Sequence, residues 1–174
     1  MNAAQALLPG FFQKVLRASG VFIIALHLFA CSEDTGQEDV IEPYALQVYK
    51  TPSCGCCGDW VTHMKANRFS ISVVNQKNIV HVKERFEIPV NARSCHTAST
   101  VDGFVFEGHV PAKYIRQFLD SPPDGAYGLT VPGMPVGSPG MEVEDKFKPY
   151  SILMLMAEAK PQVYIKVDSY QQQF

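Results

Sequence analysis

The chain has 174 residues, the size of one ordinary domain. Its 15 basic and 17 acidic residues give a net charge of -2, which excludes a broad nucleic-acid-binding surface because such a surface needs a basic excess. The composition is 47% hydrophobic and 18% charged, too apolar for general disorder. No apolar run reaches the roughly 18 residues of a membrane-spanning helix, so a multi-span membrane protein is also excluded.

The first thirty residues have the pattern of an export signal. Residues 1–30 contain two basic residues, no acidic residue and an apolar stretch at 21–30 that is too short to span a bilayer. Residues 28–31 at its end read Leu-Phe-Ala-Cys, which resembles the bacterial lipoprotein cleavage box. We therefore expect a signal peptide of the lipoprotein type over 1–30 and lipidation of Cys31. A plain signal peptide cleaved nearby is the alternative.

The next segment is acidic. Residues 32–43 hold five acids and no base, which predicts that 31–43 form a solvated tether between the anchor and the folded domain.

From residue 44 onwards, strand and helix patterns alternate. Apolar spacing and Pro or Gly breakers predict a strand at 45–49, a helix after the first cysteines, a strand at 69–74, a short helix at 79–86, a hairpin at 97–107 and a helix from 111 to 121. This is the thioredoxin-like order. We predict an α/β fold, a thioredoxin-like mixed sheet flanked by helices, over 44–168.

Further elements follow that core. Residues 131–141 predict a loop rich in Pro, Gly and Met, and 150–156 and 162–167 read as C-terminal strands that can pair with each other. The polar end, 169–174, is expected to be a frayed tail.

Three cysteines within four positions are the strongest chemical signal. Cys54, Cys56 and Cys57 lie between a predicted strand and a predicted helix, whose N-terminus lowers a thiol pKa. Cys54 and Cys57 alone have the Cys-x-x-Cys spacing of a redox pair. Cys56 departs from that pattern, because a third thiol offers a competing disulfide. Three close thiolates form a soft metal chelate instead.

More soft ligands are expected to approach this cluster. In a thioredoxin-like fold, the loop carrying Cys95 and His96 faces the Cys-x-x-Cys loop, and His109 lies at the end of the hairpin. Met134 and Met141 lie in the Pro/Gly-rich loop. Thiolate and thioether together select Cu(I) over harder ions, and imidazole suits copper as well.

Several alternatives remain open from the residues alone. Four cysteines can form two structural disulfides in three pairings, although a loop this short gains little from closure. Cys54 and Cys57 can act as a thiol-disulfide or copper oxidoreductase. Three thiolates and one imidazole can form a structural zinc site from Cys54, Cys57, Cys95 and His96. A lipid-anchored interaction module without metal is the last alternative.

Other candidates have ordinary structural interpretations. Trp60 is expected to be a core residue beside the site. Met64, Met154 and Met156 fit core positions, and His63 and His81 fall among polar neighbours and are expected to be solvated.

Four motifs in order resemble the CopG-like bacterial copper-resistance proteins. They are Tyr49 to Cys57, Ser94 to Ala98, Asp102 to Ala112, and Val131 to Glu142. The resemblance implies a thioredoxin-like fold, periplasmic export and copper handling, with Cys54, Cys56 and Cys57 binding copper. The nearby helpers that it implies are Cys95, His96, His109, Met134 and Met141.

We therefore predict a periplasmic copper-binding protein of copper homeostasis or resistance. One Cu(I) held by three thiolates carries an excess negative charge that is costly to bury, and bridging the thiolates across several ions reduces it, so more than one Cu(I) per chain is expected. The predicted partners are copper ions and a periplasmic copper donor or acceptor, with a membrane anchor at Cys31. Zinc is the alternative metal.

Overall fold

The structure is a computed structural model that describes residues 44–174. The predicted signal peptide, Cys31 and the acidic tether lie outside these residues and stay predictions. The elements are β1 (Ala45–Lys50), α1 (Gly55–Ala66), β2 (Ser70–Asn75), α2 (Val80–Arg85), η1 (Val90–Ala92), β3 (Thr97–Ser99), β4 (Val105–Glu107), α3 (Ala112–Asp120), β5 (Ala126–Thr130), β6 (Tyr150–Met156), β7 (Gln162–Val167) and η2 (Tyr170–Gln173).

The strands form one seven-stranded mixed sheet in the order β2-β1-β3-β4-β5-β6-β7. β1 runs parallel to β2 and antiparallel to β3, and β3 and β4 form the predicted antiparallel hairpin. This four-strand order, followed by α3, is compatible with the predicted thioredoxin-like arrangement. The α/β class with a mixed sheet is confirmed. No helix among residues 44–174 is long and apolar enough to cross a membrane.

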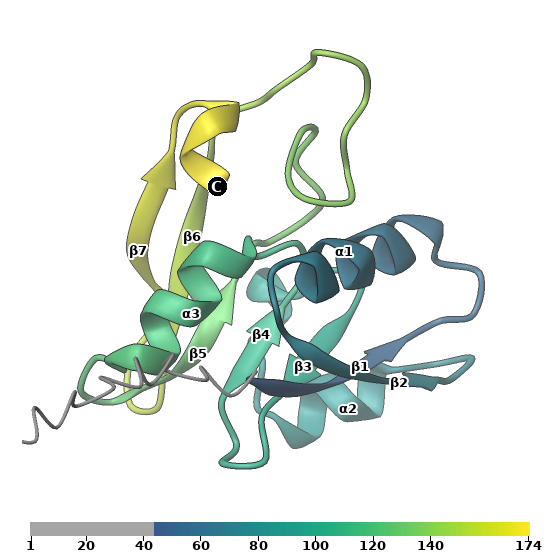
Figure 1. Cartoon of the computed structure of the whole chain (residues 1–174). Helices are drawn as coiled ribbons and strands as arrows, with labels where there is room; N and C mark the ends of the chain where they lie inside the picture. Colours follow the sequence, from purple (N-terminus) through teal and green to yellow (C-terminus); the bar gives the residue numbers. More distant parts are fainter. Residues whose placement is uncertain (1–43) are drawn as a thin grey trace, which may run out of the picture. The chain divides into compact units, whose positions relative to one another are not determined.

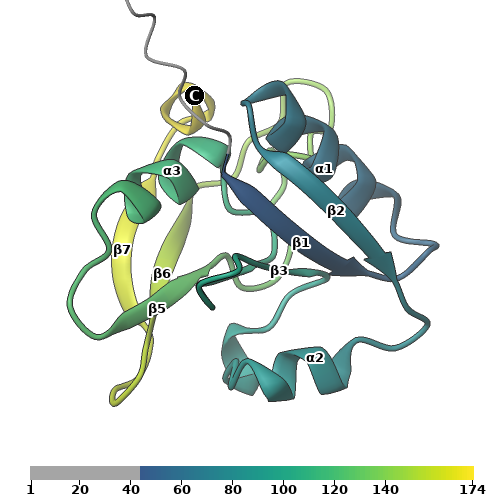
Figure 2. The ribbon, with the colours of Figure 1, turned by 60° about the horizontal axis from the view of Figure 1, so that its bottom comes forward.

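Helices cover both faces of the first half of the sheet. Figures 1 and 2 show α1 on one face and α2 on the other. The main core fills the space between the sheet and helices α1 and α3. Its central row runs across four strands through Val48, Ala98, Phe106 and Leu129, which are all fully buried. On the opposite side, Val82 of α2 belongs to a smaller cluster.

Strand β5 was not predicted. It pairs parallel with β4 and antiparallel with β6, and so joins the predicted β6–β7 hairpin to the rest of the sheet. Gly128 lies in its middle, where an added Cβ would stand 1.8 Å from the Val105 carbonyl oxygen. The glycine that allows this close strand approach also weakens the strand pattern in the sequence.

The prediction of a frayed C-terminal tail is wrong. Residues 170–173 form η2, and Ser169 and Gln172 make a reciprocal capping box that satisfies its first turn. Gln173 is fully buried: its side-chain amide donates to the Gly137 carbonyl at 2.9 Å, and its side-chain oxygen accepts from the Tyr150 hydroxyl at 2.6 Å. The polar tail is ordered because its polar groups have partners inside the fold.

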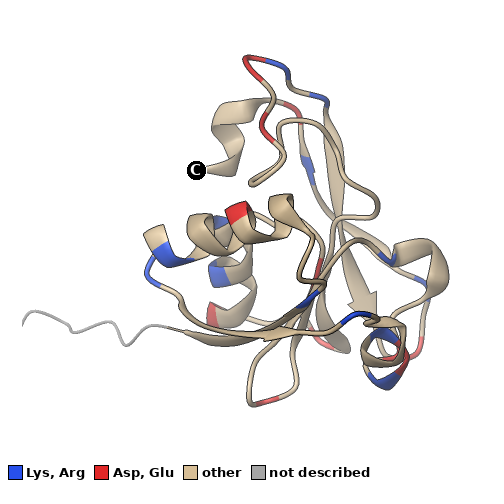
Figure 3. Ribbon diagram, turned by 90° about the vertical axis from the view of Figure 1, so that its right-hand side faces the viewer, with Lys and Arg blue, Asp and Glu red and all other residues tan. Residues whose placement is uncertain are grey.

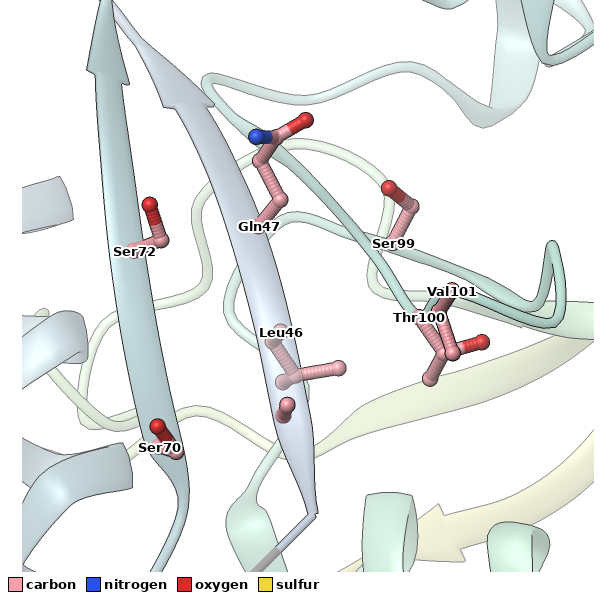
Figure 4. A pocket seen from close by; sticks show the side chains of 8 residues that line it. Leu46, Gln47, Ser70, Ser72, Ser99, Thr100 and Val101 are labelled. Carbon is pink, nitrogen blue, oxygen red and sulfur yellow. The ribbon is translucent and has the colours of Figure 1, made fainter.

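Charges do not single out one side of the protein. In Figure 3, basic and acidic residues are mixed along the same elements. A surface groove of about 320 Å³ lies on the β1–β2–β3 part of the sheet, lined by residues such as Gln47, Ser72 and Ser99 (Figure 4). None of the predicted metal ligands lines it, so the chemistry lies elsewhere.

Candidate metal centre

The first cysteines lie at the start of α1, as predicted. Cys54 is the N-cap residue, Cys56 and Cys57 fall in the first turn, and this turn contains no acidic side chain. Cys57, Trp60, Val61 and Met64 form the buried face of the helix, also as predicted. The unpaired backbone N–H groups and the positive end of the helix dipole therefore favour negatively charged sulfur at this end.

Four cysteine sulfurs gather at this point. The Sγ atoms of Cys54, Cys56, Cys57 and Cys95 all lie within 4.8 Å of one another. Cys54 and Cys57 are joined by a disulfide, whereas Cys56 and Cys95 are free among the described residues. The sulfurs of Cys54 and Cys56 are 3.6 Å apart. The long-range approach of Cys95 to the first three cysteines is thus present.

Cys95 also belongs to a second group of possible ligands. Its Sγ lies 3.3 Å from Nδ1 of His96 and 3.0 Å from Nε2 of His109. The Nδ1–H of His109 donates to the Pro139 carbonyl at 2.7 Å, so its Nε2 presents a lone pair toward Cys95. This is the arrangement in which an imidazole binds a metal through one nitrogen while a carbonyl fixes the other.

Burial sets the protonation of this second group. It lowers the pKa of His96 well below its usual value, assisted by the nearby His109 and Lys83, and it lowers the pKa of His109 as well. Both imidazoles are therefore neutral near pH 7 and able to act as ligands. Burial, followed by the negative charge of Cys56, raises the pKa of Cys95 to about 11, so a metal must displace a proton from this thiol.

The His96 ring is enclosed by aromatic side chains. It is fully buried, with its centroid 4.4 Å from the Trp60 ring and 5.1 Å from the His109 ring. Trp60 is also fully buried and donates its indole N–H to the Val110 carbonyl at 2.8 Å, which confirms it as a core residue beside the site. The Nε2 atom of His96 is buried without a hydrogen-bond partner.

The Pro/Gly/Met-rich loop contacts both the Cys95 segment and the start of α1 through two of its glycines. Ser94, next to Cys95, donates its hydroxyl to the carbonyl of Gly133. Gly140 packs so closely on α1 that an added Cβ would lie 2.6 Å from both the Cys56 carbonyl oxygen and the Trp60 nitrogen. Met134 and Met141 directly follow these two glycines. Met134 is 53% exposed and Met141 is half-buried, and their role as ligands stays a prediction.

The prediction that His63 is solvated is wrong. Its Nε2 accepts a hydrogen bond from the backbone N–H of Ala112, at the start of α3, at 3.1 Å. Partial burial lowers the pKa of His63 to about 4, so the ring is neutral and able to accept. His81, in contrast, is exposed as predicted. The hydrogen bond between α1 and α3 had no signal in the local sequence, because its donor is 49 positions away.

Sequence reasoning also missed a buried ionic network behind Cys95. Lys83 and Glu107 form an ion pair with a 2.5 Å Nζ–Oε1 distance, and both side chains are almost fully removed from water. Thr97 accepts a hydrogen bond from Lys83 and donates one to Glu107. The one available signal was the placement of these charges next to strongly apolar residues, Val82 and Phe106.

The fold and the site define a mixed α/β protein with a thiol- and imidazole-rich centre capable of holding a metal. The family model described as "Protein of unknown function, DUF411" matches residues 92–141. The solved structure named "Copper resistance protein copG- Form 2" is 38% identical, with a TM-score of 0.68, and the match covers 72% of this chain and 99% of that chain. A second structure, "Copper resistance protein copG- Form 1", is also 38% identical, with a TM-score of 0.67 and coverages of 72% and 98%.

No curated protein matches the chain. The structural matches extend over nearly the full length of the copper-resistance proteins at substantial identity. The chain belongs to the CopG-like copper-resistance family, as the four sequence motifs indicated.

Proposed function

We propose that this protein is a periplasmic copper-binding protein that holds Cu(I), and that it lowers free copper or passes the ion to a partner. The observation that carries the proposal is the convergence of four cysteine sulfurs within 4.8 Å, with one of them shared by two imidazoles. Thiolates are soft ligands that suit Cu(I), and imidazole suits copper as well. The copper-resistance relatives support copper as the ion.

More than one Cu(I) is proposed for the fully loaded protein. Cys95 belongs both to the four-cysteine group and to the group with His96 and His109, so its sulfur can bridge two ions. Sharing thiolates between ions reduces the excess negative charge that a single ion with several thiolates would carry into a partly buried site. The Cys54–Cys57 disulfide must first be reduced, which takes two electrons and two protons.

Counting copper ions tests this proposal. The reduced protein is titrated with Cu(I) without oxygen, and native mass spectrometry counts the ions while alkylation reports thiol protection. We expect several ions and protected thiols in the wild type, and fewer ions in Cys56→Ser. Ser53→Ala, an exposed neighbour without a thiol, is the matched control. Binding of one ion with all thiols still reactive would refute the multinuclear proposal, and no binding would refute copper binding itself.

The proposed location rests on the sequence of residues 1–30. Export to the periplasm and lipidation of Cys31 would place the copper centre at a membrane surface, where a donor or acceptor protein exchanges the ion. The intact mass of the membrane-extracted protein tests this directly. An acylated chain that begins at Cys31 supports the proposal, whereas an unmodified chain recovered from the soluble fraction, or one cleaved elsewhere, contradicts it.

A copper-linked oxidoreductase is the second candidate, and the Cys54–Cys57 disulfide favours it. Oxidation of the dithiol releases two protons and two electrons, and the two electrons would reduce two Cu(II) to two Cu(I). Cys57 is fully buried and Cys54 is partly exposed, so Cys54 is the sulfur that a reaction partner reaches. A disulfide reduction potential below about -300 mV, typical of structural bridges, would count against this activity.

The structural zinc alternative makes a different prediction. Two of its four ligands, Cys54 and Cys57, are paired as a disulfide in this structure, and Cys56 has no role in the set. Because Cu(I) binds soft ligands more strongly than zinc does, excess Cu(I) should displace zinc from the reduced protein. Zinc that stays bound under these conditions would identify it as the metal of the site.

A further inference from the structure

The carboxylate of Glu107 receives hydrogen bonds from both sides of the Cys95–His96 pair. Its Oε1 accepts from the backbone N–H of Ser94 at 2.6 Å, and its Oε2 accepts from the Thr97 hydroxyl at 2.6 Å. Ser94 immediately precedes Cys95, and Thr97 immediately follows His96. One side chain, at the end of β4, therefore holds both ends of the two-residue segment that supplies a sulfur and an imidazole to the centre.

Other contacts complete this support. The backbone N–H of Gly108 donates to the His96 carbonyl at 2.9 Å, and that of Val131 donates to the Glu107 carbonyl at 3.0 Å. Lys83, from α2 on the far side of the sheet, provides the opposite charge at 2.5 Å from Oε1. The Glu107 side chain is fully buried, so its hydrogen bonds do not compete with water and its geometry is fixed by these partners.

The free-energy balance of the Lys83–Glu107 pair gives it little weight as a source of stability. Removing a carboxylate and an ammonium from water costs about as much as their pairing returns, and well-packed apolar residues of similar size are often equally stable or more so. An ion pair at this position gains little for the fold as a whole. Its hydrogen bonds do, however, hold the residues on both sides of Cys95 and His96.

We propose that Glu107 is a positioning residue of the metal centre, which holds Cys95 and His96 in the geometry that binds the ion, with Lys83 as its counter-charge. This inference rests on the proposed copper-binding function. Partners that orient metal ligands typically change metal affinity by about 10- to 100-fold when removed, and we expect an effect in that range.

A double-mutant cycle separates positioning from general stability. Cu(I) affinity is measured by competition with a chromophoric Cu(I) chelator for wild type, Glu107→Gln, Cys95→Ser and the double variant, with circular dichroism to verify folding. Glu107→Gln keeps the size of the side chain and removes its charge. We expect it to weaken binding about 10- to 100-fold in the wild-type background and by a smaller factor in Cys95→Ser, because one of the two ligands that it positions is then absent. The exposed Glu84→Gln is the matched control and should bind like wild type.

A second variant covers the case in which Glu107→Gln does not fold. Lys83→Met combined with Glu107→Leu removes both charges, which avoids leaving one buried charge unpaired. It should fold and still bind Cu(I) more weakly, because the two hydrogen bonds to Ser94 and Thr97 are lost. Wild-type affinity in this variant would overturn the positioning role.

The outcomes distinguish this inference from the proposed function. If the wild type fails to bind Cu(I), the proposed function falls and the positioning role falls with it. If the wild type binds but Glu107→Gln binds equally well, or loses the same factor with and without Cys95, copper binding stands and the positioning role is refuted.

Discussion

Gly140, where the Pro/Gly/Met-rich loop packs on α1, allows a quantitative prediction of how a substitution beside the metal centre changes stability. Its φ angle is +82°, and an added Cβ would lie 2.6 Å from the Cys56 carbonyl oxygen, 2.6 Å from the Trp60 nitrogen and 3.1 Å from the Trp60 Cα. All three atoms belong to the backbone of α1, which cannot move aside as a flexible side chain would. Gly140→Ala must therefore separate the loop from the helix.

The cost has two parts. An L-residue with a positive φ costs roughly 1–2 kcal/mol, and forcing an extra methyl group against packed backbone costs roughly 1–3 kcal/mol more. Gly133→Ala in the same loop is the matched control, because its φ is +71° and nothing lies within 4 Å of its added Cβ. The backbone strain and the unfolded-state entropy are similar for the two, so their difference isolates the close contact, at roughly 1–3 kcal/mol.

Urea unfolding of the purified protein and of both variants measures this difference. We expect Gly140→Ala to lower the free energy of unfolding by roughly 1–3 kcal/mol more than Gly133→Ala, and to lower Tm by roughly 3–10 °C more. Equal losses in the two variants would show that the loop does not pack against α1 as described.

Three further predictions concern other parts of the site. His63→Gln should reduce the loss of stability between pH 6.5 and pH 4.5 by about 1–2 kcal/mol. The pKa of His63 in the folded protein is about 4, so the unfolded chain binds more protons in that window, and the glutamine side chain still accepts the hydrogen bond from Ala112. Gln173→Ala should lower the free energy of unfolding in urea by about 2–3 kcal/mol, because it leaves buried polar groups without partners. Met141→Leu and Met134→Leu should weaken Cu(I) binding in chelator competition and leave stability within about 0.5 kcal/mol.

Each of these has its own control and contrary result. If the free energy of unfolding depends on pH equally in His63→Gln and the wild type, the His63 ring is not neutral at its hydrogen bond. The pKa values of the buried His96 and His109 shift in the same direction, so some pH dependence is expected to remain in the variant. For the C-terminal segment, Gln171→Ala at an exposed position should leave the free energy of unfolding almost unchanged. A loss equal to that of Gln173→Ala would contradict the burial of Gln173. Unchanged copper affinity in both methionine variants would exclude thioether ligands.

The elements that sequence predicted are those with an unambiguous apolar period. Cys57, Trp60, Val61 and Met64 share one face, and this spacing correctly gave α1 and its buried side. Strand β5 has no such period, because Gly128 interrupts it and its burial comes from β4 and β6 on either side. The local pattern of a short strand that is buried by its neighbours carries little information about its position.

The C-terminal segment failed as a prediction for a related reason. Its glutamines look solvated in sequence, yet Gln173 is buried because Gly137 and Tyr150, both distant in the chain, satisfy its amide. The same applies to Glu107, whose importance for the site appears only once the hairpin places it behind Ser94 and Thr97. Cysteines that lie close together in the sequence indicate a metal site, whereas the groups that orient the ligands are brought into place only by tertiary contacts.

The loop at 131–141 carries two candidate ligands that the sequence identifies and two glycine contacts that only the fold shows. Its chemical and its structural contribution to the metal centre can therefore be tested separately. Its fixed points are Gly133 and Gly140, which contact the segments carrying Cys95 and Cys56, and each is followed directly by a methionine. Replacing a methionine by leucine changes the donor atom and leaves the loop in place, whereas Gly140→Ala moves the loop and leaves the donor atom. Weaker copper binding in Met141→Leu alone therefore indicates a thioether ligand. Weaker binding in Gly140→Ala alone indicates that the loop serves the centre by its packing and by the Pro139 carbonyl that orients His109.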